Sequence, residues 1–311
     1  MANKKIVAVL GRKALSLLFP DQRTAVLNAA KAIADLVEEK YDIVITHSNA
    51  EQVGMIHTAM TEFSRLDSSY PVAPMSICSA MSQGYIGYDL QNAIRSELVR
   101  RGIYKPVSTV ITQVRVDPFD PAFSNPSKVI GRYMSENDSI AEEAKGNYTV
   151  KEEQGYRRII ASPKPIDIYE IDAIRTLLDA GQLVIAGGGG GIPVLQQHEN
   201  LKGASAIIEK DYTGEKLAEL TDADTLIFLT GVEHACLNFQ KPEEKALSSI
   251  TTDQAQAYLE EGHFAEKSMY PKMEAAIQFV RLGNGRRAII TDMAHAKAAL
   301  RGTAGTQITL S

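Results

Sequence analysis

The sequence predicts a three-layer α/β protein with a mainly parallel central sheet. Short runs that are apolar at every position alternate along the chain with amphipathic helical patterns. Strands that are apolar on both faces are typical of a parallel sheet that helices cover on both sides. A segment rich in proline and polar residues interrupts this alternation near the middle of the chain.

The first two elements show the pattern most clearly. The run IVAVL at 6–10 indicates a buried strand, and residues 25–39 indicate a helix because their apolar side chains recur on one helical face. The same reasoning predicts strands over 42–46, 107–114, 182–186, 225–229 and 287–291, and helices over 89–101 and 168–180.

Two segments break the alternation. Residues 117–126 contain three prolines and predict a loop, because proline has no backbone N–H to donate. Residues 135–155 are polar and weakly periodic. Together they predict an excursion from the sheet, either a lid or a small subdomain.

The composition limits the compartment and the partners. With a formal net charge of −5, the chain lacks the basic excess of general nucleic-acid binders, so an anionic ligand must meet a local cluster of cations. The two cysteines, Cys78 and Cys236, have no metal-ligand or redox spacing, which is typical of a reducing compartment. No apolar run is long enough for a signal peptide or a membrane span. We therefore expect a cytoplasmic protein that binds neither membrane nor nucleic acid.

Five consecutive glycines, Gly187–Gly191, directly follow a predicted strand. Ordering each glycine costs roughly 0.5–1 kcal/mol relative to alanine. A close approach of backbone N–H groups to a phosphate would justify that cost. Because the run fits neither the P-loop pattern nor G-x-G-x-x-G, we expect phosphate binding through a different architecture.

Three lysines in loop-like contexts could supply the required cations. They are Lys128 in NPSK, Lys210 in EKD and Lys272 in KSMYPK. Each alone is most simply a solvated surface lysine, but phosphoryl transfer between two anions needs cations around the developing charge. Asp211, beside Lys210, is placed to orient lysines rather than to act as a base.

Other catalytic patterns are missing from the sequence. The six histidines form no i, i+4 metal pair and no H-E-x-x-H motif, so no metal site is expected. No G-x-S-x-G motif supports a hydrolase.

Six blocks in order along the chain resemble the carbamate kinase family of the amino acid kinase superfamily. They are SQGYIGYDLQNAI (82–94), TQVRVDPFDPAFSNPSKVIG (112–131), GYRRIIASPKP (155–165), VIAGGGGGIPV (184–194), GASAIIEKD (203–211) and GHFAEKSMYPKMEAA (262–276). The resemblance implies a single αβα sandwich over 1–311 with about eight central strands, a protruding subdomain near 117–155, and a homodimer. It also implies reversible phosphoryl transfer between ATP and carbamate with Mg²⁺, giving ADP and carbamoyl phosphate.

The resemblance assigns roles to residues by motif. The catalytic set that it implies is Lys128, Lys210, Asp211 and Lys272. The substrate and phosphoryl side comprises Gly11, Arg12, Lys13, Ser48, Asn49, Ala50, Glu51, Gly187, Gly188, Gly189 and Gly190. The nucleotide side comprises Thr230, Gly231, Val232, Met269 and Pro271, together with Lys210, Asp211 and Lys272.

The chain departs from the family in both N-terminal loops. Where the family reads G-G-N-A-[LI], this chain has Gly11-Arg12-Lys13-Ala14-Leu15, and THSNAEQVG at 46–54 replaces T-H-G-N-G-P-Q-V-G. Glu51 would repel an anionic substrate, by about 4 kcal/mol at ~4 Å and an effective dielectric of ~20. An ion pair with Arg12 or Lys13 would remove that repulsion. A further change is Glu209, which replaces an expected aspartate before Lys210.

Three functions remain open at this point. The first is an active carbamate kinase in which Arg12 or Lys13 supplies cationic stabilisation. The second is a catalytically impaired homologue that binds nucleotide or acts as a partner subunit. The third is a kinase for another carboxylate or carbamoyl substrate.

Overall fold

The structure, a computed structural model, describes residues 4–15, 20–67, 69–266, 268–283 and 285–311. Within these residues the centre is an eight-stranded sheet in the order β15-β17-β16-β12-β1-β2-β9-β3. Neighbouring strands are parallel except β16 and β17. The strands are β1 (Lys5–Leu10), β2 (Asp42–His47), β3 (Val107–Thr109), β9 (Leu183–Ile185), β12 (Thr225–Thr230), β15 (Ser249–Thr251), β16 (Arg287–Asp292) and β17 (Thr306–Thr309). The predicted fold class and strand number are confirmed.

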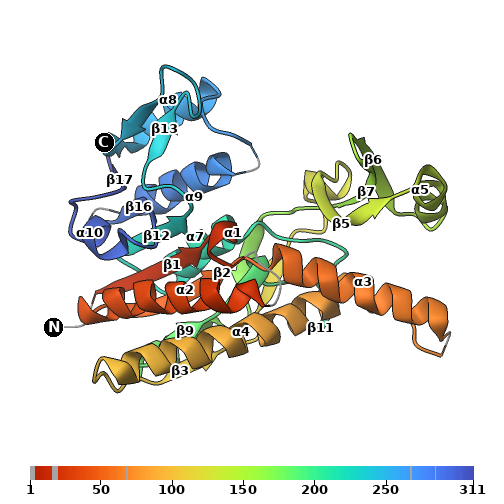
Figure 1. Cartoon of the computed structure of the whole chain (residues 1–311), viewed down its shortest axis with the longest axis horizontal. Helices are drawn as coiled ribbons and strands as arrows, with labels where there is room; N and C mark the ends of the chain where they lie inside the picture. The colour runs from red at the N-terminus through yellow and green to blue at the C-terminus, as the bar shows by residue number, and fades with distance from the viewer. Residues whose placement is uncertain (1–3, 16–19, 68, 267, 284) are drawn as a thin grey trace.

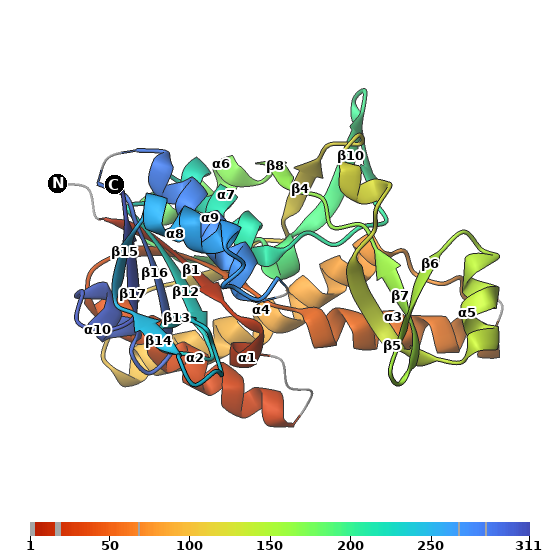
Figure 2. The ribbon, with the colours of Figure 1, turned by 90° about the horizontal axis from the view of Figure 1, so that it is seen from above.

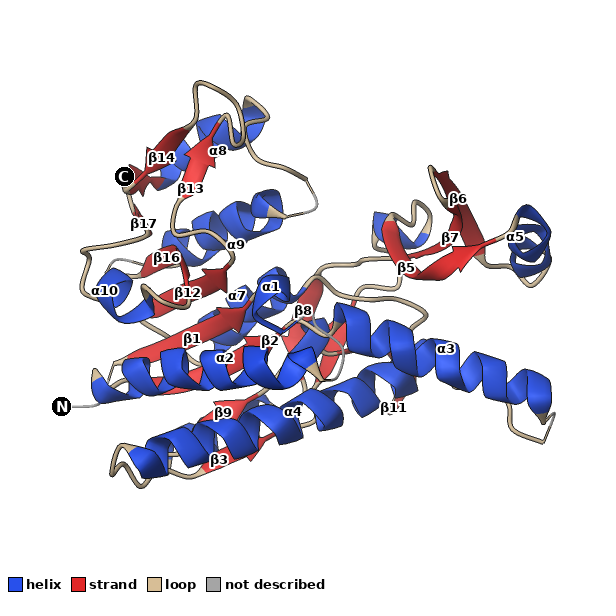
Figure 3. Cartoon of the chain, in the orientation of Figure 1, coloured by secondary structure: helices blue, strands red, loops and turns tan. Residues whose placement is uncertain are grey.

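Helices cover both faces of this sheet, as Figures 2 and 3 show. Alternate residues of β1 explain why: Ile6, Ala8 and Leu10 pack in one buried cluster, while Val7 and Val9 pack in the other. The first cluster includes residues of α2 (Asp21–Glu38), α4 (Met75–Arg100) and α10 (Ala296–Leu300). The second includes residues of α6 (Ile171–Asp179), α7 (Lys210–Leu220), α8 (Thr252–Glu260) and α9 (Met269–Arg281). None of the described helices is long and apolar enough to cross a membrane.

The single strand predicted over 107–114 is wrong. The segment divides into β3 in the central sheet and β4 (Gln113–Val116) in a separate sheet, β11-β10-β4-β8. The break lies at Thr112, whose carbonyl accepts from the Ile192 N–H at 2.9 Å and whose hydroxyl accepts from the Gly187 N–H at 2.9 Å. The other strands of the second sheet are β8 (Pro165–Ile168), β10 (Ile192–Gln197) and β11 (Asn200–Gly203). The chain turns at this point because Thr112 bonds to the glycine run.

A three-stranded unit stands apart from the central sheet, beside the long helix α3 (Ala50–Leu66) (Figure 1). It consists of β5 (Lys128–Met134), α5 (Glu136–Glu143), β6 (Tyr148–Glu152) and β7 (Gly155–Ile160), in the order β5-β7-β6. Arg132 of β5 contacts Glu62 of α3 at 2.6 Å. The loop before the unit contains only the short helix η1 (Pro121–Phe123) among the described elements. Two further short strands, β13 (Ala235–Leu237) and β14 (Lys245–Leu247), form a hairpin.

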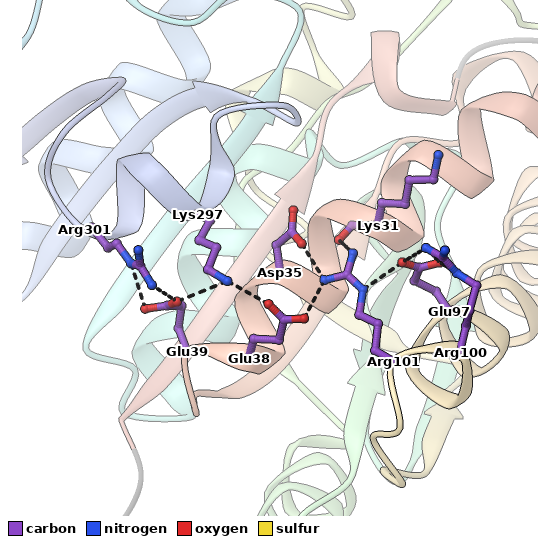
Figure 4. Close-up of polar contacts among 9 residues, drawn as sticks. All are labelled: Lys31, Asp35, Glu38, Glu39, Glu97, Arg100, Arg101, Lys297 and Arg301. Carbon is purple, nitrogen blue, oxygen red and sulfur yellow. Dashed lines mark hydrogen bonds and ion pairs between the residues drawn. The ribbon is translucent and has the colours of Figure 1, made fainter.

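Arg101, which directly follows the last residue of α4, joins this helix to α2 (Figure 4). Its guanidinium contacts the carboxylates of Asp35 at 2.5 Å, Glu38 at 3.0 Å and Glu97 at 2.8 Å. It also donates to the Lys31 carbonyl at 3.3 Å. Hydrogen bonds from Arg100 and Arg101 lower the pKa of Glu97, and bonds from Lys297 and Arg101 lower that of Glu38.

We expect Arg101→Met to lower the free energy of unfolding by roughly 1–2 kcal/mol at pH 7, because three carboxylates lose a shared partner near the surface. Glu97 and Glu38 have pKa values in the folded protein below the unfolded value of 4.5, so their ion pairs stabilise the fold fully above pH 4.5. This stabilisation disappears as the pH falls through the folded pKa values. The difference in unfolding free energy between wild type and Arg101→Met should therefore shrink on acidification. Urea unfolding at pH 7 and pH ~3.5 measures both effects. Arg100→Met is the control, because Arg100 contacts Glu97 alone among the described carboxylates. An equal loss in that variant would contradict the role given to Arg101.

Candidate active site

The carboxyl ends of four central strands bring several predicted site segments together. Gly11 follows β1, Ser48 follows β2, the glycine run follows β9, and Thr230 ends β12. The Gly11 N–H donates to the Leu229 carbonyl at 2.8 Å, and the Ser48 N–H donates to the Leu10 carbonyl at 3.0 Å. Ligands of open α/β sheets bind at this edge. The structure therefore places both N-terminal loops and the glycine run at the same edge of the central sheet.

Glycine is required in the run for steric reasons. Gly189 and Gly190 have φ of 67° and 92°, a region that favours glycine. A Cβ on Gly189 would lie 2.0 Å from Asn49 Nδ2, and one on Gly190 would lie 2.1 Å from the Ile208 carbonyl oxygen. Close packing thus accounts for the presence of Gly189 and Gly190, which the sequence analysis attributed to phosphate binding alone. The amide nitrogens of Gly188 and Gly189 nevertheless have no acceptor among the described residues, so they remain able to bind an anion.

Polar side chains of β2 and of the loop after it pack against the glycine run. Thr46 Oγ1 donates to the Gly187 carbonyl at 2.8 Å, and buried Asn49 donates to Ser82 Oγ at 2.7 Å. His47 is buried against Gly188, and burial lowers its pKa to about 4, so the imidazole is neutral at pH 7. These contacts hold the loop after β2 rigidly against the run.

Two buried lysines share one oxygen of Asp211. Lys210 Nζ lies 3.0 Å and Lys272 Nζ 3.1 Å from Asp211 Oδ2, and the three residues are 8%, 7% and 1% exposed respectively. Lys272 also donates to the Ser268 carbonyl at 3.1 Å. Burial lowers the pKa of Lys272, whereas for Lys210 the charges of Asp211 and Glu209 outweigh burial and raise it. Asp211 therefore contacts both ammonium groups through one oxygen.

The third lysine joins this cluster through Glu209. The Glu209 carboxylate contacts Lys128 Nζ with one oxygen and lies 3.4 Å from Lys210 Nζ with the other. Burial would raise the pKa of Glu209, but Lys210 and Lys128 outweigh it and lower the value to about 2. Three ammonium groups against two carboxylates leave one net positive charge. The cluster can therefore attract an anion.

The lysines occupy regular elements, so the prediction that they lie in loops is wrong. Lys128 begins β5, Lys210 begins α7, and Lys272 lies in the first turn of α9. Each is therefore fixed by the backbone of its element. The glycine run adjoins α7, because Thr213 Oγ1 donates to the Gly190 carbonyl at 2.8 Å.

Three of the substituted residues in the N-terminal loops are exposed, whereas Ser48 is buried. Arg12 is exposed at the start of α1 (Arg12–Leu15), and Ala50 and Glu51 are exposed in the first turn of α3. Arg12 and Glu51 form no ion pair within 4.0 Å in the described part of the chain, and the side chain of Lys13 lies outside it. The predicted pair with Arg12 is therefore not formed. An acidic residue at a helix N-terminus is favourable in its own right, which accounts for Glu51.

The predicted nucleotide-side residues lie on two elements. Thr230, Gly231 and Val232 lie at and beyond the end of β12, where a Cβ on Gly11 would come within 3.4 Å of Thr230 Cα. Met269 and Pro271 lie in the turn of α9 that carries Lys272.

Sequence reasoning missed the residues that support the site. In the sequence Glu209 stands out only as a replacement, and nothing marks Ser82, His47 or Thr213. The one usable signal was the position of Glu209 beside Lys210. The other contacts join segments far apart in the chain, so no local pattern reveals them.

The site thus combines the lysine cluster with the unpaired amides of Gly188 and Gly189 at the carboxyl ends of the central strands. This combination is suited to holding and transferring a phosphoryl group. The model of the amino acid kinase family matches residues 16–292. The chain belongs to the amino acid kinase family.

Full-length relatives refine this class. The chain is 49% identical over 308 residues to the carbamate kinase-like protein YqeA of Escherichia coli, covering 98% of this chain and 99% of that protein. It is 46% identical over 311 residues to the carbamate kinase of Clostridium perfringens, with the same coverage. A solved carbamate kinase of Giardia lamblia bound to AMP-PNP superposes with a TM-score of 0.94 at 35% identity, covering 100% and 99% of the two chains. The protein is a carbamate kinase-like phosphotransferase.

Proposed function

We propose that the phosphoryl acceptor is carbamate and that the protein catalyses ATP + carbamate = ADP + carbamoyl phosphate in both directions. The observation that carries the proposal is the cluster of three ammonium groups organised by Asp211 and Glu209. Carbamate already presents an anionic oxygen, so its attack on a phosphoryl group needs charge stabilisation and no general base. Relatives named carbamate kinase, which this chain matches over nearly its full length, support this acceptor.

We assign the roles accordingly. Lys128, Lys210 and Lys272 stabilise the charge that spreads over the transferred phosphoryl oxygens, and Asp211 positions the last two. The amides of Gly188 and Gly189 bind the phosphoryl group. Thr230, Gly231, Val232, Met269 and Pro271 border the ATP or ADP.

Mg²⁺ would enter with the nucleotide in this proposal. The described residues contain no group of three or more His, Cys, Asp or Glu side chains that could hold a metal ion. Mg²⁺ commonly binds through substrate phosphates, water and one or two carboxylates, so the absence of such a group is compatible with it. The buried Asp211 Oδ1 has no hydrogen-bond partner and is the one carboxylate oxygen of the described cluster that remains available.

We further propose a single domain over 1–311 that forms a homodimer in the cytoplasm. Both cysteines are free thiols, as expected in a reducing compartment.

A second candidate function is nucleotide binding with little turnover. It is favoured by the exposed Arg12 at a position where the family has glycine. A chain of this kind would retain the glycine run and the lysines while the acceptor side is altered.

A coupled assay for ADP release, run with and without carbamate beside calorimetric titration of ATP, tests the proposal. We expect ATP to bind and ADP to form only with carbamate. In the double variant Arg12→Gly/Lys13→Asn we expect slower turnover, because the loop loses two cations. ATP binding without ADP release would contradict the proposal, and a gain of activity in the double variant would identify the natural loop as impaired.

A further inference from the structure

Glu209 occupies an unusual position for an acidic residue. It is the N-cap of α7, but its side chain makes no hydrogen bond to the helix amides. Its carboxylate instead turns to two ammonium groups, Lys128 Nζ and Lys210 Nζ. Asp and Ser caps usually satisfy a helix N–H, so this side chain is directed away from its ordinary local role.

The two lysines come from different parts of the fold. Lys128 begins β5 of the three-stranded unit, and Lys210 begins α7 against the central sheet. Among the described carboxylates, Glu209 alone contacts Lys128. The Lys128 side chain is 38% exposed and the Glu209 side chain is 18% exposed, so an anion from solvent can reach this pair.

The Glu209 carboxylate resembles a phosphoryl group in one respect: both present negatively charged oxygens that accept hydrogen bonds from ammonium groups. Phosphoryl oxygens and the Glu209 oxygens compete for the same N–H donors, and a lysine donates only three hydrogen bonds. Lys210 already donates to Asp211 as well as to Glu209. An incoming phosphoryl group must therefore replace Glu209 or share its partners.

We propose that the Glu209 carboxylate is an internal competitor of the phosphoryl-bearing substrate. It occupies the anion position between Lys128 and Lys210 until the substrate displaces it, and it thereby weakens the binding of simple anions that cannot make further contacts. This inference rests on the proposed roles of Lys128 and Lys210. It makes Glu209 a residue that determines which anions bind, rather than a catalytic residue.

Isothermal titration of the full-length protein with inorganic phosphate tests the inference at one ionic strength. We expect Glu209→Gln to bind phosphate about tenfold more tightly than wild type, because the amide is neutral and leaves both ammonium groups available. Glu274→Gln is the matched control, since Glu274 pairs with Lys164 and Tyr212 outside the lysine cluster. We expect its phosphate affinity to change less than twofold.

A double-mutant cycle separates competition from a structural role. In a Lys128→Met background the gain from Glu209→Gln should disappear, because one of the two contested donors is gone. Unchanged or weaker phosphate binding in Glu209→Gln, or a gain that persists without Lys128, would overturn the inference. If Glu209→Gln does not fold, Glu209→Asp should still bind phosphate more tightly than wild type, since its shorter side chain cannot contact both lysines. The inference and the proposed function can fail separately. If Glu209→Gln binds phosphate more tightly but wild type shows no carbamate-dependent turnover, the role of Glu209 is supported and the proposed function is refuted.

Discussion

Lys272→Met will lower kcat by about 10²–10³-fold, the usual cost of removing one donor that stabilises transition-state charge. Lys272 is buried, and its ammonium group bonds to Asp211 Oδ2 at 3.1 Å. Methionine keeps much of the volume but carries no charge, and Asp211 retains Lys210 as a partner at 3.0 Å. The fold should therefore survive while catalysis falls. Steady-state kinetics should show the loss in kcat with KM for ATP changed less.

Lys216→Met on α7 is the matched control for this variant. Lys216 pairs with Glu219 rather than with the cluster, so the same substitution removes a charge outside the site. We expect turnover within about twofold of wild type. Similar kinetics in the Lys272→Met and Lys216→Met variants would remove Lys272 from the catalytic set.

Gly190→Ala will lower the free energy of unfolding by roughly 2–5 kcal/mol. The residue has φ of 92°, which costs an L-residue roughly 1–2 kcal/mol. Its new Cβ would lie 2.1 Å from the Ile208 carbonyl oxygen, and the overlap adds roughly 1–3 kcal/mol. Because Ile208 immediately precedes Glu209 and Lys210, the displaced backbone should also lower activity. Urea unfolding measures the first effect and the ADP-release assay the second.

The Gly262→Ala variant separates the cost of backbone strain at positive φ from the cost of steric overlap of the new Cβ. Gly262 has φ of 74°, but a Cβ there would meet nothing within 4 Å. We expect a loss of only about 1–2 kcal/mol and unchanged turnover. If both alanine variants lose the same stability, the close contact with Ile208 does not contribute.

The fold was largely predictable because burial on both faces leaves a direct sequence signature. The run at 6–10 is apolar throughout since its alternate residues enter two different clusters. The division of 107–114 was not predictable, because it depends on hydrogen bonds that Thr112 accepts from a segment that follows much later in the chain. The periodicity of apolar residues carries no information on hydrogen-bond partners that are distant in the sequence.

The candidate site was predictable as a set of residues but not as an arrangement. The sequence blocks identified Lys128, Lys210 and Lys272, and local order placed Asp211 beside Lys210. The bridge from Lys128 to Glu209 joins residues 81 positions apart, so only the fold reveals it. The steric need for glycine likewise arises from Asn49 and the Ile208 carbonyl, which belong to other parts of the chain.

The most direct test of the lysine cluster as the phosphoryl-transfer site is ATP formation from ADP and carbamoyl phosphate, measured with luciferase for wild type and Lys272→Met. The account predicts steady ATP production by wild type and a rate about 10²–10³-fold lower in the variant. Equal rates in the two proteins, or no ATP from a wild-type protein that binds ADP, would contradict it.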